Sequence, residues 1–181
     1  MAETDIFKYS TNERLGKMDV DLIDVICSPD EDNGGAGTIG DLLFQVTEIP
    51  NAVSVPGGSA LLHSITAISS GTVVTGGFDL VITSDSTALV DESGDAETGD
   101  AVTASPDIDS PASVIENTLG FVSFGSLTTV STLASAGSKS NLGIVCKAES
   151  GSTSLYVWGI VQSTTDYAEG RLFLRLGFIK D

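Results

Sequence analysis

The segment DESGDAETGD, residues 91–100, places five carboxylates and two glycines within ten residues, a composition that could ligate calcium. An EF-hand loop needs oxygen ligands at its first, third and fifth positions, glycine at the sixth and glutamate at the twelfth. Counted from Asp91, the sixth position is Ala96 and the twelfth is Val102, so the pattern fails. Dense like charge keeps a loop extended in water. We therefore interpret the segment as a solvated acidic loop, with a looser calcium site as the alternative.

Few other residues could carry chemistry. His63 is the only histidine, and a regular strand would place it on the side of Leu61 and Ile65. A Ser–His–Asp triad would have to use it, yet no G-x-S-x-G motif is present. Neither Cys27 nor Cys146 has the C-x-x-C partner or second histidine that a zinc site requires. We predict no catalytic residue, no metal site and no cofactor, and we do not expect an enzyme.

The two cysteines each lie in an apolar run, DLIDVIC and LGIVCKA. Cysteine in such a run is typical of a buried free thiol, and a disulfide between facing strands is the alternative. The N-terminal segment MAETDIFKYSTNERLGK has no apolar region of the kind that a secretory signal contains. We therefore expect the chain to fold in a reducing compartment, the cytoplasm of the cell that makes it.

The dominant local pattern is a short run rich in Val, Ile, Leu and Thr that ends at Gly, Ser, Asp or Pro. Eight such runs predict an all-β chain, an antiparallel β-sandwich or barrel-like domain. In the last run, alternation places Leu172, Leu174, Leu176 and Phe178 on one face of a strand, and Arg171, Phe173, Arg175 and Ile179 on the other. The eight runs span residues 20–27, 41–49, 60–69, 78–83, 119–124, 142–148, 154–162 and 171–179.

The segments between these runs differ in composition. SPASVIEN, residues 110–117, has a capping serine followed by proline and predicts one short helix. Residues 28–37 and 91–111 mix acids with Gly, Pro or Ser, and they predict long acidic loops. Residues 1–18 are polar, and we predict that they form an N-terminal arm that becomes ordered on a partner. Residues 19–181 are predicted to form a single β-domain.

The charge is unevenly distributed along the chain. The formal net charge is −17, and residues 18–138 contain eighteen Asp and Glu but no Lys or Arg. Nucleic-acid binding requires Lys and Arg that displace counterions from phosphates, so this block excludes DNA and RNA as partners. An anionic membrane surface is excluded for the same reason, and no apolar run reaches the length of a membrane span.

The order of segments in the second half resembles a known family. SALLHSITAIS, FDLVIT, SPASVIENTLGFVSF, NLGIVCKAESGSTSLYV and LFLRLGF follow one another as in the capsid decoration (cement) proteins of tailed bacteriophages. The resemblance covers about residues 59–181, and residues 19–58 would be an added β-element. It implies a structural virion protein that binds the outer surface of the capsid and bridges subunits of the major capsid protein, as a homotrimer or, alternatively, a dimer.

Two sets of residues follow as candidate contacts with the capsid or between subunits. Lys8, Arg14 and Lys17 in the arm could meet acidic patches of the shell, and Arg171, Phe173 and Arg175 form a mixed charged and apolar strand face. The alternative function is a tail, head-fibre or other virion module that binds host-surface glycans. It would need exposed aromatic side chains, for which the candidates are Tyr156, Trp158 and Tyr167.

Overall fold

The computed structural model describes residues 20–27, 39, 42–70, 76–86, 117–131, 134–163 and 171–180. The helix predicted at residues 110–117 lies outside these ranges except for Asn117, and so do the two predicted acidic loops. The described residues form nine strands: β1 (Val20–Cys27), β2 (Leu42–Ile49), β3 (Ser59–Ser70), β4 (Phe78–Thr83), β5 (Thr118–Phe124), β6 (Thr128–Ser131), β7 (Ala134–Lys147), β8 (Leu155–Val161) and β9 (Arg171–Lys180).

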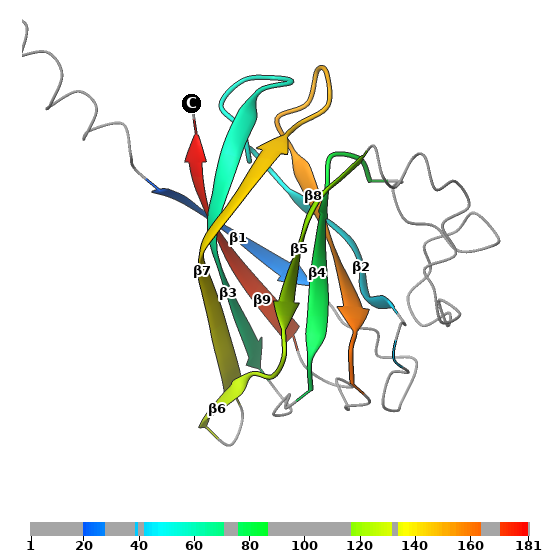
Figure 1. Cartoon of the computed structure of the whole chain (residues 1–181), viewed down its shortest axis with the longest axis vertical. Helices are drawn as coiled ribbons and strands as arrows, with labels where there is room; N and C mark the ends of the chain where they lie inside the picture. The colour runs from blue at the N-terminus through cyan, green and yellow to red at the C-terminus, as the bar shows by residue number, and fades with distance from the viewer. Residues whose placement is uncertain are drawn as a thin grey trace, which may run out of the picture.

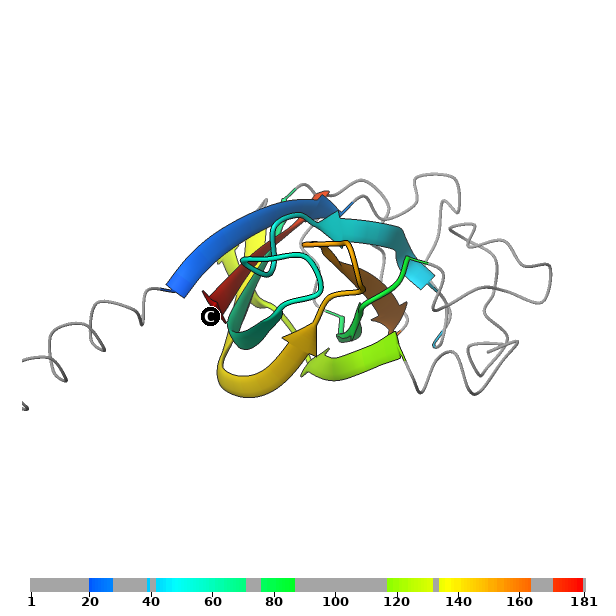
Figure 2. The ribbon, with the colours of Figure 1, turned by 90° about the horizontal axis from the view of Figure 1, so that it is seen from above.

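The strands form two antiparallel sheets that pack face to face (Figure 1). Sheet A has the strand order β1-β9-β3-β7-β6, and sheet B has the order β2-β8-β4-β5. Seen from above, the sheets are opposite walls of a flattened ring, with β1 beside β2 at one side and β5 beside β7 at the other (Figure 2). The predicted fold class, an all-β antiparallel sandwich, is confirmed for the described residues.

Residues 20–58 contribute to both sheets. Within this segment β1 pairs with β9 at one edge of sheet A, and β2 pairs with β8 at one edge of sheet B. The loop after β2 is also tied to the loop after β7, because Val53 donates to the carbonyl of Thr153 and Gly57 donates to that of Ser152. The two described strands of the segment that the resemblance left unmatched are therefore part of the same sandwich.

Strand β9 shows why the predicted alternation holds. It is paired on both sides, with β1 and with β3. Leu174, Leu176 and Phe178 are fully buried between the sheets, and Leu172 is nearly so. Burying side chains of this size contributes roughly 1.5–3 kcal/mol each, which fixes the face that the strand turns to the core.

A β-bulge interrupts the regular alternation of strand β3 in sheet A. Opposite β9, the β3 residues Leu62 and Ser64 pair with consecutive residues, so His63 is an extra residue in β3. The extra residue puts Ile65 in the core, whereas Leu61 is half-buried and paired with Ile179 on the other face. The prediction that His63 shares a face with both Leu61 and Ile65 is therefore wrong, because regular alternation does not pass through a bulge.

The core side of sheet B depends on close contact between a glycine and a ring. Gly159 in β8 lies under Phe44 of β2, and a Cβ added to Gly159 would stand 2.3 Å from Cε1 of that ring. Phe44 is fully buried. Real Cβ atoms do not approach a carbon so closely, so glycine at this position is what allows the ring to occupy the core.

Both cysteines are fully buried and free, as predicted. Burial raises the pKa of the Cys27 thiol to about 12, against a hydrogen bond with Thr47 that lowers it. Burial likewise raises the pKa of Cys146 to about 11. Because the thiolate is the reactive form, both residues act as apolar core side chains at neutral pH.

Replacing Gly159 by alanine should test this packing. We expect Gly159→Ala to destabilise the fold by about 1–3 kcal/mol, because the new methyl displaces the Phe44 ring in a filled core. Urea unfolding followed by tryptophan fluorescence measures the change. Gly125→Ala is the matched control, since a Cβ there would meet no atom within 4 Å, and equal stability of the two variants would contradict the prediction.

Candidate interaction surface on the outer face of sheet A

The outer face of sheet A is the face turned away from sheet B. The β9 residues that alternate with the buried leucines lie on this outer face. From Phe173 to Ile179, each of them has direct cross-strand neighbours in β1 and β3, and the β3 neighbour has one in β7, so the four residues form a row across the sheet. Of the nine large apolar side chains that are exposed among the described residues, five lie on this face: Val20, Leu22, Ile26, Ile68 and Val145. Such clustering is typical of an interaction surface rather than of scattered exposed residues.

Two of the rows are apolar throughout. The first apolar row lies at the end of β9 next to the C-terminus, and the second apolar row lies six residues earlier in β9. The members of each row are direct cross-strand neighbours, so their side chains lie side by side on one surface. The first apolar row is Val20, Ile179, Leu61 and Val145, and the second is Ile26, Phe173, Ile68 and Ala136.

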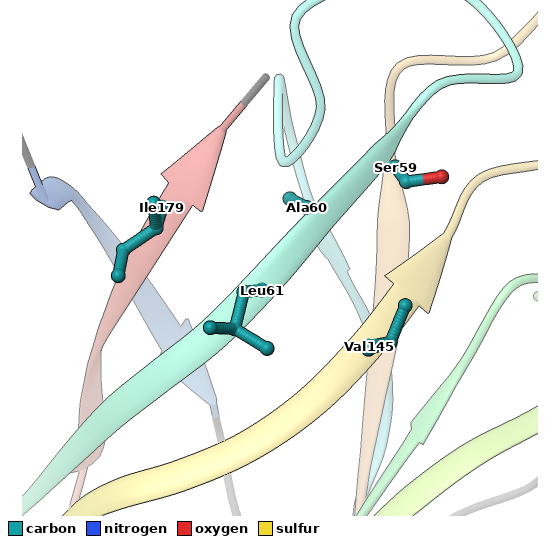
Figure 3. A pocket seen from close by; sticks show the side chains of 5 residues that line it. All are labelled: Ser59, Ala60, Leu61, Val145 and Ile179. Carbon is teal, nitrogen blue, oxygen red and sulfur yellow. The ribbon is translucent and has the colours of Figure 1, made fainter. Parts of the chain in front are cut away.

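The first apolar row surrounds a shallow hollow (Figure 3). The hollow has a volume of about 300 Å³ and is lined by Leu61, Val145 and Ile179 from three neighbouring strands, together with Ser59 and Ala60. Val145 is 69% exposed at its rim. The lining offers no charged side chain, so the hollow fits an apolar group.

Between the two apolar rows lies a polar row. Arg175 of β9 forms two parallel hydrogen bonds with Asp24 of β1, at 2.7 Å from Nε and 2.8 Å from a terminal nitrogen. The next two strands continue the row with Thr66 and Ser138, whose hydroxyl oxygens are 3.0 Å apart. Each side chain of the polar row therefore has a partner within the sheet, and two hydrogen bonds orient the Arg175 guanidinium.

Gly177 keeps the face flat beside the polar row. A Cβ at Gly177 would stand 2.5 Å from the Ser64 hydroxyl and 2.8 Å from the Val20 side chain. These neighbours therefore close over the glycine from both adjacent strands. The surface between the first apolar row and the polar row is continuous because position 177 carries no side chain.

The charges of the described residues are divided between the sheets. Every Lys and Arg that the structure describes lies in β7 or β9, both in sheet A. The strands of sheet B carry Glu48 and Asp79 and no base. Two of the bases are neutralised by β1, Arg175 by Asp24 and Lys180 by Asp21, the latter pair at 2.9 Å. Sheet A is thus the part of the described chain where charge is balanced or positive.

The structure places the predicted contact residues unevenly. Lys8, Arg14 and Lys17 lie outside the described residues. Arg171 pairs with Ser70 through the backbone of β9, and its side chain lies outside the described part. Phe173 and Arg175 lie on the outer face as predicted, in the second apolar row and the polar row.

The sequence prediction missed the contributions of β1, β3 and β7 to this surface. The signal was present in VDLIDVIC, where apolar residues occupy both faces of one strand. Val25 and Cys27 are buried, whereas Leu22 is 62% and Ile26 54% exposed. An edge strand that is apolar on its solvent face indicates a surface that another molecule covers.

The residues proposed for a glycan site do not form an exposed aromatic groove in the described part. Trp158 is fully buried, and its indole N–H donates to the Thr83 hydroxyl at 3.0 Å. Tyr156 is half-buried. The pKa of its hydroxyl is raised mainly by burial and further by the nearby negative charge of Glu48. Tyr167 lies outside the described residues. The burial of Trp158 removes the side chain best suited to stack on a sugar.

Within the described ranges, no three His, Cys, Asp or Glu side chains gather in a way that could hold a metal ion. The same ranges contain no helix that is long and apolar enough to cross a membrane. His63 is half-buried in the β3 bulge. The interaction surface is therefore the feature of the described chain that most needs a functional explanation.

Comparison with known proteins finds no matching protein family and no matching curated protein. Among solved structures, the chain is similar to one in the X-ray structure of tomato aspermy virus, with 6% identity, a TM-score of 0.38 and coverage of 90% of this chain and 78% of that one. It is also similar to a chain of the Kashmir bee virus empty particle at acidic pH, with 9% identity, a TM-score of 0.24 and coverage of 87% and 86%. TM-scores of this size do not place the chain in either fold.

The ion pair between Asp24 and Arg175 should be visible in the titration of the Asp24 carboxyl. Hydrogen bonding to Arg175 lowers the pKa of Asp24 below its ordinary value of 3.8. The stabilisation from the pair is thus present above the unfolded-state pKa and is lost as pH falls through the lower folded-state value. In an NMR titration, the Asp24 carboxyl should titrate below 3.8 and return toward 3.8 in Arg175→Gln. Identical midpoints in the two proteins would show that the pair does not form in solution.

Proposed function

We propose that this chain is a structural virion protein of a tailed bacteriophage, which binds the outer surface of the capsid and stabilises it by bridging subunits of the major capsid protein. The observation that carries the proposal is the way apolar and charged side chains are divided between the two sheets. Exposed apolar rows and all described cations lie on sheet A of an otherwise acidic sandwich. A surface of this kind attaches to protein rather than to a small substrate.

The resemblance of residues 59–181 to decoration proteins supports the same function. The segments that carry it are the strands β3, β4, β5, β7, β8 and β9 of the described fold. They build most of both sheets, so the resemblance concerns the whole sandwich rather than one motif. Residues 20–58 add one edge strand to each sheet, which extends the family pattern without interrupting it.

The charge distribution favours the outside of the shell. Residues 18–138 carry eighteen acids and no base, and phosphates repel such a surface. A protein lining the DNA-filled interior would suffer that repulsion over its whole area. On the outside, the acidic side faces solvent and keeps particles from associating with one another.

Attachment to the shell is assigned to the N-terminal arm. The arm contains Lys8, Arg14 and Lys17, and the other five Lys and Arg of the sequence lie in β7 and β9. Because the chain is so acidic elsewhere, these three side chains are suited to meet acidic patches of the major capsid protein. Electrostatic contacts of this kind guide association and weaken as salt rises.

The number of copies in each particle tests the proposed function directly. Quantitative mass spectrometry of purified virions against the major capsid protein should give a ratio near one, or a simple fraction that still corresponds to hundreds of copies. A shell-wide ratio is required because a decoration protein occupies every equivalent site. A few copies per particle would overturn the proposal and indicate a tail or vertex component.

Removal of the arm should separate binding from folding. A chain lacking residues 1–17 should bind undecorated capsids at least tenfold more weakly, with an unchanged circular dichroism spectrum and melting temperature. The variant Lys8→Gln/Arg14→Gln/Lys17→Gln keeps the length of the arm and should lose most of the same affinity. Wild-type affinity in both proteins would show that the arm does not make the contact.

A further inference from the structure

We infer that two copies of this chain associate through the outer faces of sheet A. The inference rests on the surface itself and does not require the proposed function, since it concerns the purified protein alone. The contacting residues are the two apolar rows and the polar row between them. In an isologous dimer the same patch lies on both partners, so the patch must be complementary to itself.

The arrangement of the rows meets that condition. A two-fold axis parallel to the strands places each row against the same row of the partner. A two-fold axis across the strands exchanges the first apolar row with the second. In both cases the two apolar rows meet apolar rows. The polar row faces its own copy with the first axis, and with the second axis it faces the row of Leu22, Gly177, Ser64 and Ser140. Arg175 and Asp24 remain paired within each copy, so neither of these two charges is left without its partner when the faces close.

Electrostatic repulsion between two copies is weakest at the outer face of sheet A. Each chain carries a net charge of −17, so most surfaces of two copies repel each other. Sheet A holds every described base and only two described acids, both in ion pairs with those bases. Contact through sheet A therefore avoids direct opposition of acidic surfaces and leaves the acidic strands of sheet B on the outside of the dimer.

The size of the face sets the expected affinity. Four strands spaced ~4.8 Å apart and four rows spaced ~6.6 Å apart cover roughly 19 by 26 Å, or about 500 Å² for each copy in projection. Stable interfaces bury about 800 Å² on each partner, and transient ones bury less. The dimer should therefore be reversible, with a dissociation constant in the micromolar range.

The hollow gives the contact a specific anchor. It lies between Leu61, Val145 and Ile179 in the first apolar row. With the two-fold axis across the strands, this row faces the second apolar row, whose largest side chain is Phe173 in the same strand as Ile179. An aromatic side chain placed in an apolar hollow is the kind of contact that dominates interface energies.

Analytical ultracentrifugation of the full chain, from about one to several hundred micromolar, tests the dimer. We expect concentration-dependent dimerisation that strengthens between low and high NaCl, because salt screens the repulsion between acidic chains while the apolar contact remains. Val145→Glu and Ile26→Glu each place a charge in one apolar row, at side chains that are exposed in the monomer. Each should raise the dissociation constant at least tenfold.

Phe121→Glu is the matched control. Phe121 is an exposed strand residue of sheet B, 64% accessible, and its substitution adds the same charge to the opposite side of the molecule. It should change the dissociation constant by less than twofold. Circular dichroism of each variant checks folding, and the two sheet A variants test the face independently, so one that misfolds does not remove the test.

Three results would overturn the inference. The wild-type chain could stay monomeric at all concentrations and salt conditions, which would leave the face for a different partner, such as an acidic surface of another protein. Phe121→Glu could weaken the dimer as much as the sheet A variants do. The dimer could also persist in both sheet A variants. None of these results depends on capsid binding, so the dimer and the proposed function are tested independently of each other.

Discussion

Strand β9 is hydrogen-bonded along both edges, and the rest of the described structure depends on that pairing. Its neighbours are β1 and β3, so the register of β9 sets the register of three strands together. A slip of one residue would move Arg175 between the sheets and expose Leu174 and Leu176. The burial of these leucines therefore fixes more than the core. It also determines that Phe173, Arg175 and Ile179 lie on the outer face, and that β1 and β3 extend each of them into a row.

The charge distribution follows from the same topology. β9 and β7 are the strands that carry bases, and both pair with β3 within sheet A, although they lie far apart in the sequence. β1 brings Asp21 and Asp24 to the neighbouring edge, where they pair with Lys180 and Arg175. An acidic chain is thus given one sheet on which the described acids do not outnumber the bases. On its outer face apolar contact can determine association, because the electrostatic repulsion that acts elsewhere is weakest there.

Much of the fold could be predicted from the sequence because β-structure is encoded locally. Runs such as VDLIDVIC and FDLVIT match β1 and β4 at both ends, and alternation assigned the faces of β9. β6 and the first half of β7 were missed, since Ser, Thr, Gly and Ala at residues 128–141 give no apolar period. The site was predicted only within one strand. Its rows join residues more than a hundred positions apart, and no local pattern in a single sequence specifies which strands are neighbours or where a bulge such as that at His63 reverses the faces.

The edges of sheet A oppose association through its strands, which is the alternative to the inferred association through its face. An exposed edge strand can pair with the edge of another copy, and proteins oppose this with charges or with short edge strands. One edge of sheet A is β6, which has four residues, and the other is β1, which carries two aspartates. In an edge-to-edge pairing of two β1 strands, these aspartates would bring like charges together. The face offers no such opposition, since Asp24 there is already bound to Arg175. The aspartates of β1 therefore have two roles: each pairs with a base of β9, Asp24 on the outer face and Asp21 on the other side of the strand, and both protect the edge.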